Sequence, residues 1–174
     1  MKVHQKPVTA LNFSQDGSMI VAGSRDCKVS LILTTEQEGY FKLSWHNGQI
    51  TQARFFEGNK YVITSSLDNT LKIWNIESKS PVYTLASVNE SIWDFELCNE
   101  DRNIIIGTAS KELLVFDISK EAETQYFHLN KSFNVVREAK KRVMQIKSLS
   151  NGKIVIVQVI LQLLSTNVFS QLWL

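Results

Sequence analysis

Residues 64–75 read Thr64-Ser-Ser-Leu-Asp-Asn-Thr-Leu-Lys-Ile-Trp-Asn75, and this stretch decides the fold. With the preceding Tyr61-Val-Ile, it contains two runs of alternating residues that are rich in β-branched and aromatic side chains. Such alternation predicts short β-strands. Asx residues can bond their own backbone or accept a left-handed φ, so the Leu67-Asp-Asn segment between the two runs predicts a tight turn. We therefore expect a β-hairpin here.

The same pattern recurs along the chain at a gapless spacing of 42 residues. Apolar and small residues stand at matching positions, for example Val8, Ile50 and Ile92, or Gly23, Ser65 and Gly107. About four short strands in each unit of roughly 40–45 residues are the mark of a propeller blade. We therefore predict an all-β chain that forms an incomplete β-propeller of three blades and part of a fourth.

The repeat also predicts the domain boundaries. Residues 1–158 form the partial propeller, with blades at about 4–43, 44–85, 86–127 and 142–158. The fourth unit begins later than the spacing requires, and the excess falls in residues 119–141, which we expect to be an enlarged loop. Residues 159–174 form an apolar tail of uncertain nature. The uncharged stretch from Ile154 to Leu174 contains several polar residues, so we favour propeller strands or a non-native tail over a membrane anchor.

Composition places the chain among globular proteins of the cell interior. Of its 174 residues, 44% are hydrophobic and 21% are charged, which excludes disordered and collagen-like classes. The net charge of +2 is too small to indicate nucleic-acid binding by the fold as a whole. Cys27 and Cys98 lack CxxC spacing, and the N-terminus lacks the pattern of a secretory signal. We expect an intracellular protein.

Four polar residues of the second unit have spacings that suit mutual hydrogen bonding. They are His46, Thr64, Asp68 and Trp74. In a four-stranded blade, these spacings bring a loop histidine, a strand hydroxyl, a turn carboxylate and an indole N–H within reach of one another. A buried carboxylate is costly unless it accepts hydrogen bonds, and this set supplies the donors. We interpret the four residues as a structural network.

This set and the closing Leu71-Lys-Ile-Trp-Asn resemble the WD-repeat family, and the resemblance extends from residue 4 to about 157. It implies a propeller scaffold without catalytic activity, catalytic residues, metal or cofactor. The alternative is a hydrolytic site with Thr64 as nucleophile and a His46–Asp68 pair. We reject it because hydrolysis needs an exposed nucleophile and an oxyanion site.

The other units keep less of this network. The first unit has His4 and Asp26, but Ala22 and Ile32 occupy the hydroxyl and indole positions. The third unit replaces all four positions, with Val88, Ile106, Ser110 and Phe116. We therefore expect these two blades to depend on apolar packing.

The resemblance also implies a partner surface on the narrow face of the propeller, beside the first strand and the hairpin turn of each blade. The matching positions proposed as partner contacts here are Arg25, Gln49, Thr51, Leu67, Ser91, Trp93, Arg142 and Met144. Among them, Trp93 is an expected interface anchor, because aromatic side chains often carry binding energy. The alternative is that Trp93 only shields strand ends.

A basic segment precedes the fourth unit. Its five cationic residues are Lys131, Arg137, Lys140, Lys141 and Arg142. Such a cluster can bind RNA phosphates, but the segment has few aromatic residues that could stack on bases. We favour a solvated loop and keep RNA contact as a weak alternative.

Within the WD-repeat family, two groups share local stretches with this chain. His4-Gln-Lys-Pro-Val-Thr-Ala-Leu and Gly23-Ser-Arg-Asp-Cys-Lys-Val resemble the WD-repeat subunit of the nuclear complex that matures large ribosomal subunit precursors. Ser91-Ile-Trp-Asp-Phe resembles the WD subunit of the cytoplasmic superkiller RNA-decay assembly. We predict a protein scaffold in ribosome biogenesis and rRNA processing, in the nucleus or nucleolus. RNA decay in the cytoplasm and direct RNA binding are the alternatives.

Overall fold

The structure is a computed structural model that describes residues 3–35, 40–85, 90–98, 102–109, 112–118, 128–134, 143–148, 154–158 and 171–172. The chain divides into two compact units, Met1–Ile92 and Trp93–Leu174. Each unit is considered by itself below.

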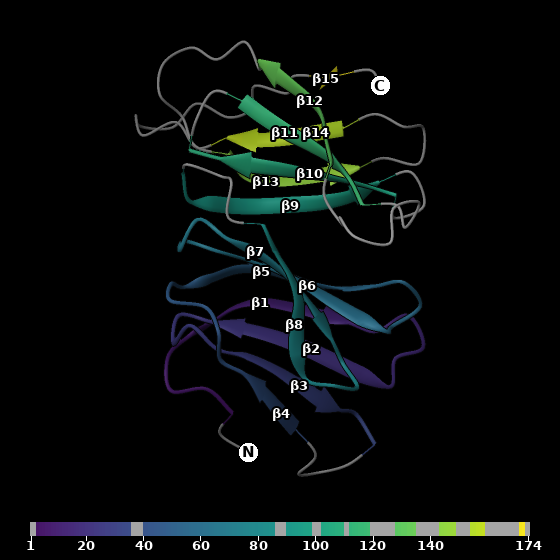
Figure 1. The fold of residues 1–174 in the computed structure, drawn as a ribbon. Coiled ribbons are helices and arrows are strands. Elements are labelled where there is room, and N and C mark those ends of the chain that lie inside the picture. The colour runs from purple at the N-terminus through teal and green to yellow at the C-terminus, as the bar shows by residue number, and fades with distance from the viewer. Residues whose placement is uncertain are drawn as a thin grey trace. The chain divides into compact units, whose positions relative to one another are not determined.

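The N-terminal unit contains two four-stranded antiparallel sheets, each with its strands in chain order. The first sheet comprises β1 (Val8–Phe13), β2 (Met19–Ser24), β3 (Val29–Leu33) and β4 (Tyr40–Leu43). The second comprises β5 (Ile50–Phe56), β6 (Tyr61–Ser66), β7 (Leu71–Asn75) and β8 (Ser80–Leu85). Figure 1 shows β1 to β4 lying side by side.

Both sheets have the same register, which explains the spacing of 42 residues in the sequence. Ala10 pairs with Gly23 in the first sheet, and Gln52 pairs with Ser65 in the second. Each first strand has an irregularity between its first and third residues. The turn residues Cys27 and Asn69 both have φ of 66°, a left-handed conformation that Asn adopts readily.

Apolar residues from both sheets form one buried cluster in this unit. The first sheet contributes Ala10, Val21, Val29, Leu31 and Leu43, and the second contributes Ile50, Ala53, Val62 and Trp74. Phe55 and Ile76 pack against the cluster. The alternating pattern thus places one face of the first sheet against one face of the second, and burial of these faces stabilises the pair.

The C-terminal unit also contains two antiparallel sheets. The larger has the order β12-β11-β10-β9 and comprises β9 (Ile92–Cys98), β10 (Asn103–Thr108), β11 (Glu112–Asp117) and β12 (His128–Asn134). The smaller comprises β13 (Val143–Ser148), β14 (Ile154–Gln158) and β15 (Gln171–Leu172). Within this unit, β10 lies against β13.

The expected enlarged loop over residues 119–141 is corrected by the structure. Residues 128–134 form β12, the fourth strand of the third sheet, beyond the predicted end of that blade at residue 127. An edge strand needs only one partner strand and no two-sided apolar pattern, so its sequence signal is weak. Within the apolar tail 159–174, residues 171–172 pair with β14.

The prediction of an all-β chain is confirmed: the described residues form antiparallel strands joined by turns and loops. Among these residues, no helix is long and apolar enough to cross a membrane.

Candidate functional site

The structure brings His46, Thr64, Asp68 and Trp74 together at one end of the second sheet. The Nδ1 atom of His46 lies 2.8 Å from an Asp68 carboxylate oxygen, and Nε2 lies 2.8 Å from the Thr64 hydroxyl. The Trp74 indole N–H donates to the same hydroxyl at 2.7 Å. The His46 and Trp74 rings also meet edge to face, with centroids 5.9 Å apart. Together, the four side chains form one continuous hydrogen-bonded network.

The two ends of this network fix the direction of its hydrogen bonds. Trp74 can only donate and an ionised Asp68 can only accept. The Thr64 hydroxyl therefore accepts from Trp74 and donates to Nε2 of His46, and Nδ1–H of His46 donates to Asp68. This assignment gives a neutral His46 with its proton on Nδ1, and it satisfies every buried polar atom of the set.

Further groups surround the Asp68 carboxylate. The Thr70 hydroxyl donates to it at 2.6 Å, and the backbone N–H groups of Asn47 and Thr70 donate at 2.9 and 3.0 Å. Burial by itself raises the pKa of Asp68, but hydrogen bonds from His46, Thr70 and Asn47 outweigh it and hold that pKa well below its usual range. The carboxylate therefore stays ionised and holds the turn in place.

Thr70 is a member of the network that the sequence analysis missed. Its hydroxyl lies 2.6 Å from an Asp68 oxygen and 3.2 Å from Nδ1 of His46. A Thr two residues after a turn Asp is a recognised signal for local bonding, so the sequence contained this information. Gly48 is a second such residue: an added Cβ would lie 2.6 Å from the backbone N of Asp68. Only Gly permits that close approach of the two loops.

The first sheet has a reduced version of this arrangement. Nδ1 of His4 lies 3.2 Å from both oxygens of Asp26, and the backbone N–H groups of Gln5 and Lys28 donate to the same carboxylate. Nε2 of His4 is buried and has no hydrogen-bond partner among the described residues. Ala22 stands where Thr64 stands in the second sheet, so the hydroxyl that would complete the network is missing.

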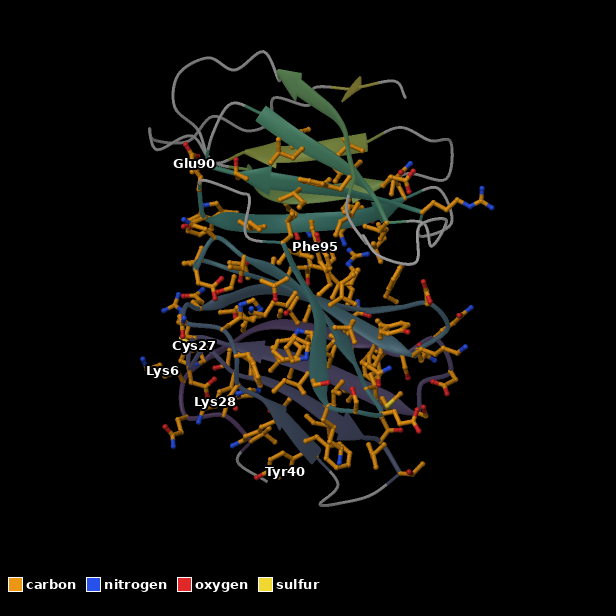
Figure 2. All side chains as sticks on the ribbon, in the orientation of Figure 1. Lys6, Cys27, Lys28, Tyr40, Glu90 and Phe95 are labelled. Carbon is orange, nitrogen blue, oxygen red and sulfur yellow. The ribbon has the colours of Figure 1, made fainter. Side chains whose placement is uncertain are left out.

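Figure 2 shows Lys6, Cys27 and Lys28 at one edge of the N-terminal unit, where the loop before β1 meets the β2–β3 turn. Asp26 lies in that turn and connects it to the loop through His4 and Gln5. As in the second sheet, a carboxylate joins the two loops at this end. In the third sheet, Ile106 and Phe116 are buried at two of the four positions, while Val88 and Ser110 lie outside the described residues.

The geometry argues against a catalytic role for the His46–Asp68 pair. The Thr64 side chain belongs to a fully buried residue, and its hydroxyl bonds both His46 and Trp74. A nucleophile must reach substrate, whereas this hydroxyl is enclosed by the sheet. Among the described residues, no group of three or more His, Cys, Asp or Glu side chains could hold a metal ion.

The predicted partner positions differ in how much of each side chain is available. Arg25 is exposed, and Gln49 and Leu67 are half-buried in the same unit. Backbone bonds join these loops, since the N–H of Arg25 donates to Pro7 and the N–H of Leu67 donates to Gln49. The positions therefore lie beside the loop–turn contacts described above.

Two predicted partner residues use their hydroxyls inside the protein. Thr51 donates to the carbonyl of Ile92 at 2.8 Å and bonds Ser65 at 2.8 Å. Ser91 donates to the carbonyl of Leu67 and to the side chain of Asn69. Both hydroxyls hold neighbouring segments together, which leaves only the outer part of each residue for a partner.

The remaining predicted contacts belong to the C-terminal unit. Trp93 is half-buried in β9. Met144 lies in β13 and Lys131 in β12, where the structure describes the backbone alone. Arg137, Lys140, Lys141 and Arg142 lie outside the described residues, so RNA contact by the basic segment stays a prediction.

Comparison with known proteins agrees with this architecture. The family "WD domain, G-beta repeat" matches residues 1–32 and 38–75, which cover most of the first sheet and the first three strands of the second. The matched residues contain the Asp26 turn and the whole set of His46, Thr64, Asp68 and Trp74. The chain is thus an all-β protein of the WD-repeat β-propeller class, with an incomplete propeller.

Similar curated proteins are connected with RNA. The "mRNA export factor GLE2" of Chaetomium thermophilum is 25% identical over 119 residues, or 67% of this chain and 32% of that protein. The "Poly(A)+ RNA export protein" of Schizosaccharomyces pombe is 28% identical over 67% of this chain and 33% of its own length. The "U3 snoRNP-associated protein-like EMB2271" of Arabidopsis thaliana is 27% identical over 60% of this chain and 22% of its length. The chain thus matches about a third or less of each of these relatives.

Proposed function

We propose that this chain is a non-catalytic WD-repeat scaffold that binds protein subunits of a nuclear RNA-processing complex. The observation that carries this proposal is the inward direction of its polar network: Thr64 is fully buried and already bonded to His46 and Trp74. With its most reactive residue types enclosed, the fold offers loop ends rather than a reaction site. Loop ends on a rigid sheet are suitable surfaces for protein partners.

The specific assignment that we propose is ribosome biogenesis, in the processing of the large-subunit rRNA precursor. A relative named for association with the U3 snoRNP supports a role with a nuclear RNA–protein particle. In this proposal the partners are proteins of that complex, any RNA contact is weak or indirect, and the protein acts in the nucleus or nucleolus.

Export of mRNA is a second candidate of equal standing. Two of the relatives described above are named as an mRNA export factor and a poly(A)+ RNA export protein. The same inert, propeller-type architecture suits either role, because both require a protein-binding surface. The cytoplasmic RNA-decay role stays an alternative prediction from the sequence.

Ultraviolet crosslinking followed by affinity purification separates these roles. For ribosome biogenesis, we expect proteins of pre-ribosomal particles, with precursor rRNA that leaves after ribonuclease treatment while the proteins remain. Enrichment of polyadenylated RNA and export proteins would favour the second candidate. Cytoplasmic decay factors would favour the third, and RNA without any protein partner would contradict every scaffold role.

Substitution of Trp93 tests the proposed partner surface. If Trp93 is an anchor, Trp93→Ala weakens partner binding by about 2 kcal/mol or more, a reduction of roughly thirtyfold. Tyr40→Ala is a matched control, because Tyr40 is an exposed aromatic residue on β4. The scaffold proposal further expects that changing Lys140, Lys141 and Arg142 together has little effect. A flatter salt dependence after that triple change would instead assign RNA binding to the basic segment.

A further inference from the structure

Three apolar side chains of β1 are exposed although their counterparts in the second sheet are covered. Val8, Leu11 and Phe13 have exposed fractions of 49%, 58% and 57%. The register of the two sheets places them at the positions of Ile50, Ala53 and Phe55. Ile50 and Ala53 are 0% exposed, and Phe55 packs against the buried cluster. Val8, Leu11 and Phe13 define what we call the open face.

The counterpart positions are covered by the first sheet, and the cover has two specific features. The first is Gly23, where an added Cβ would lie 2.9 Å from Cβ of Ile50, so only a residue without a side chain permits this approach. The second is Thr9, whose hydroxyl donates to the carbonyl of Ile50 at 2.6 Å. Apolar burial and one directed hydrogen bond therefore fix how the two sheets meet.

The hydrogen bond of this junction is repeated in the same unit. The Thr51 hydroxyl donates to the carbonyl of Ile92 at 2.8 Å, and Thr51 follows Thr9 by 42 residues. The acceptors Ile50 and Ile92 have the same spacing, and Val8 occupies the next equivalent position toward the N-terminus. Val8 thus stands where the preceding junction would have its acceptor.

We propose that the open face binds another four-stranded WD-type sheet, contributed by polypeptide outside these 174 residues. That sheet covers Leu11 and Phe13 with apolar side chains. It has a small residue at the position of Gly23, so that it can approach Val8, and a Thr or Ser at the position of Thr9. Its hydroxyl donates to the carbonyl of Val8, as Thr9 donates to Ile50.

The register argues against a second copy of this chain as the occupant through its fourth sheet. The pairing of Gln145 with Val157 corresponds to the pairing of Ala10 with Gly23. Val157 therefore stands at the position that requires a small residue, and Met144 stands at the position of the Thr. Because both junction features are missing from β13 and β14, the occupant is a different sheet.

A tandem protein tests this proposal with a cover of known fit. A copy of residues 1–42 is joined before Met1 of the full chain, which keeps the spacing of 42 residues and places Met1 at the position of Leu43. The original unit carries Leu11→Cys as a reporter, and its alkylation is measured by peptide mass spectrometry. We expect alkylation at least about tenfold slower than in the chain without the added copy, because a packed junction must open first.

The matched control is the same tandem protein with Gly23→Val and Thr9→Val in the added copy only. It retains the apolar surface but loses both junction features, so we expect the fast alkylation of the single chain. Equal rates in the tandem protein and the single chain, or equal protection in the control, would overturn the proposal. Phe13→Cys provides a second reporter if Leu11→Cys unfolds. Protection of the single chain that increases with its own concentration would also overturn it, since a second copy would then be the occupant.

Discussion

The buried network around His46 shows how one residue can determine the cost of a substitution. Asp68 receives hydrogen bonds from His46, Thr70 and the loop before β5, whereas Asp26 serves a network that has Ala22 in place of the Thr. A buried polar group that loses its partner costs more than an absent one, because desolvation is no longer compensated. The two sheets therefore offer an internal comparison.

We expect Asp68→Ala to lower the free energy of unfolding by roughly 1–3 kcal/mol, because it leaves donors on His46 and Thr70 without an acceptor. Asp26→Ala should cost less, since Nε2 of His4 already lacks a partner. Thermal and urea unfolding of the single variants measure both losses. Equal losses would contradict the role of the complete network.

The pH dependence of stability provides an independent check on Asp68. Its pKa in the folded protein lies below the usual value of 3.8, so the ionised form is favoured by folding. This contribution is complete above about pH 4 and is lost as the pH falls toward the folded-state pKa. We expect the stability difference between the wild type and Asp68→Asn to shrink between pH 5 and pH 2. A constant difference over that range would refute the assignment.

At the scale of elements, the contact between the first and second sheets depends on a missing side chain. A Cβ on Gly23 would lie 2.9 Å from Cβ of Ile50, in a junction where Ile50 is fully buried. Packed interiors resist even small increases in volume. Gly23 therefore has a packing role in β2 and not a turn role.

We expect Gly23→Ala to destabilise the N-terminal unit by about 1–3 kcal/mol. In the background of Ile50→Ala, the same substitution should cost much less, because the obstructing side chain has been shortened. A double-mutant cycle measured by urea unfolding gives the coupling between the two residues. Additive effects would show that the close approach has no energetic importance.

For the whole molecule, the two units predict separate effects of substitution. In the C-terminal unit, Asp94 is buried and accepts from the backbone N–H of Ile146 at 2.7 Å and of Phe95 at 2.9 Å. This carboxylate thereby joins β9 to β13. Its removal leaves the N–H of Ile146 without that acceptor, while the junctions around Ile50 are unaffected.

We expect Asp94→Ala to accelerate hydrogen exchange of the Ile146 amide, with little change at Ile63 in the N-terminal unit. The reverse pattern is expected for Asp68→Ala. Local opening reports the stability of the unit that contains each amide. Asp94→Asn is the control, since an amide oxygen can still accept one of the two bonds. Equal acceleration in both units would show that they unfold together.

The sequence by itself determined the repeated strands, the hairpin turns and the set of polar residues around His46. These features are local, because the period of two, the Asx turns and the spacing of 42 residues can be read along the chain. Thr70 and Gly48 could have been added by the same local reasoning. The position of β12 could not, because an edge strand is selected by its backbone pairing with β11.

Only the tertiary structure decided which apolar faces are covered. Val8, Leu11 and Phe13 have the same pattern in the sequence as Ile50, Ala53 and Phe55, yet one set is exposed and the other is packed. Burial depends on the neighbouring sheet, and alternation along a strand contains no information about that neighbour. The difference between the two sets of residues therefore comes from the presence of the first sheet beside the second.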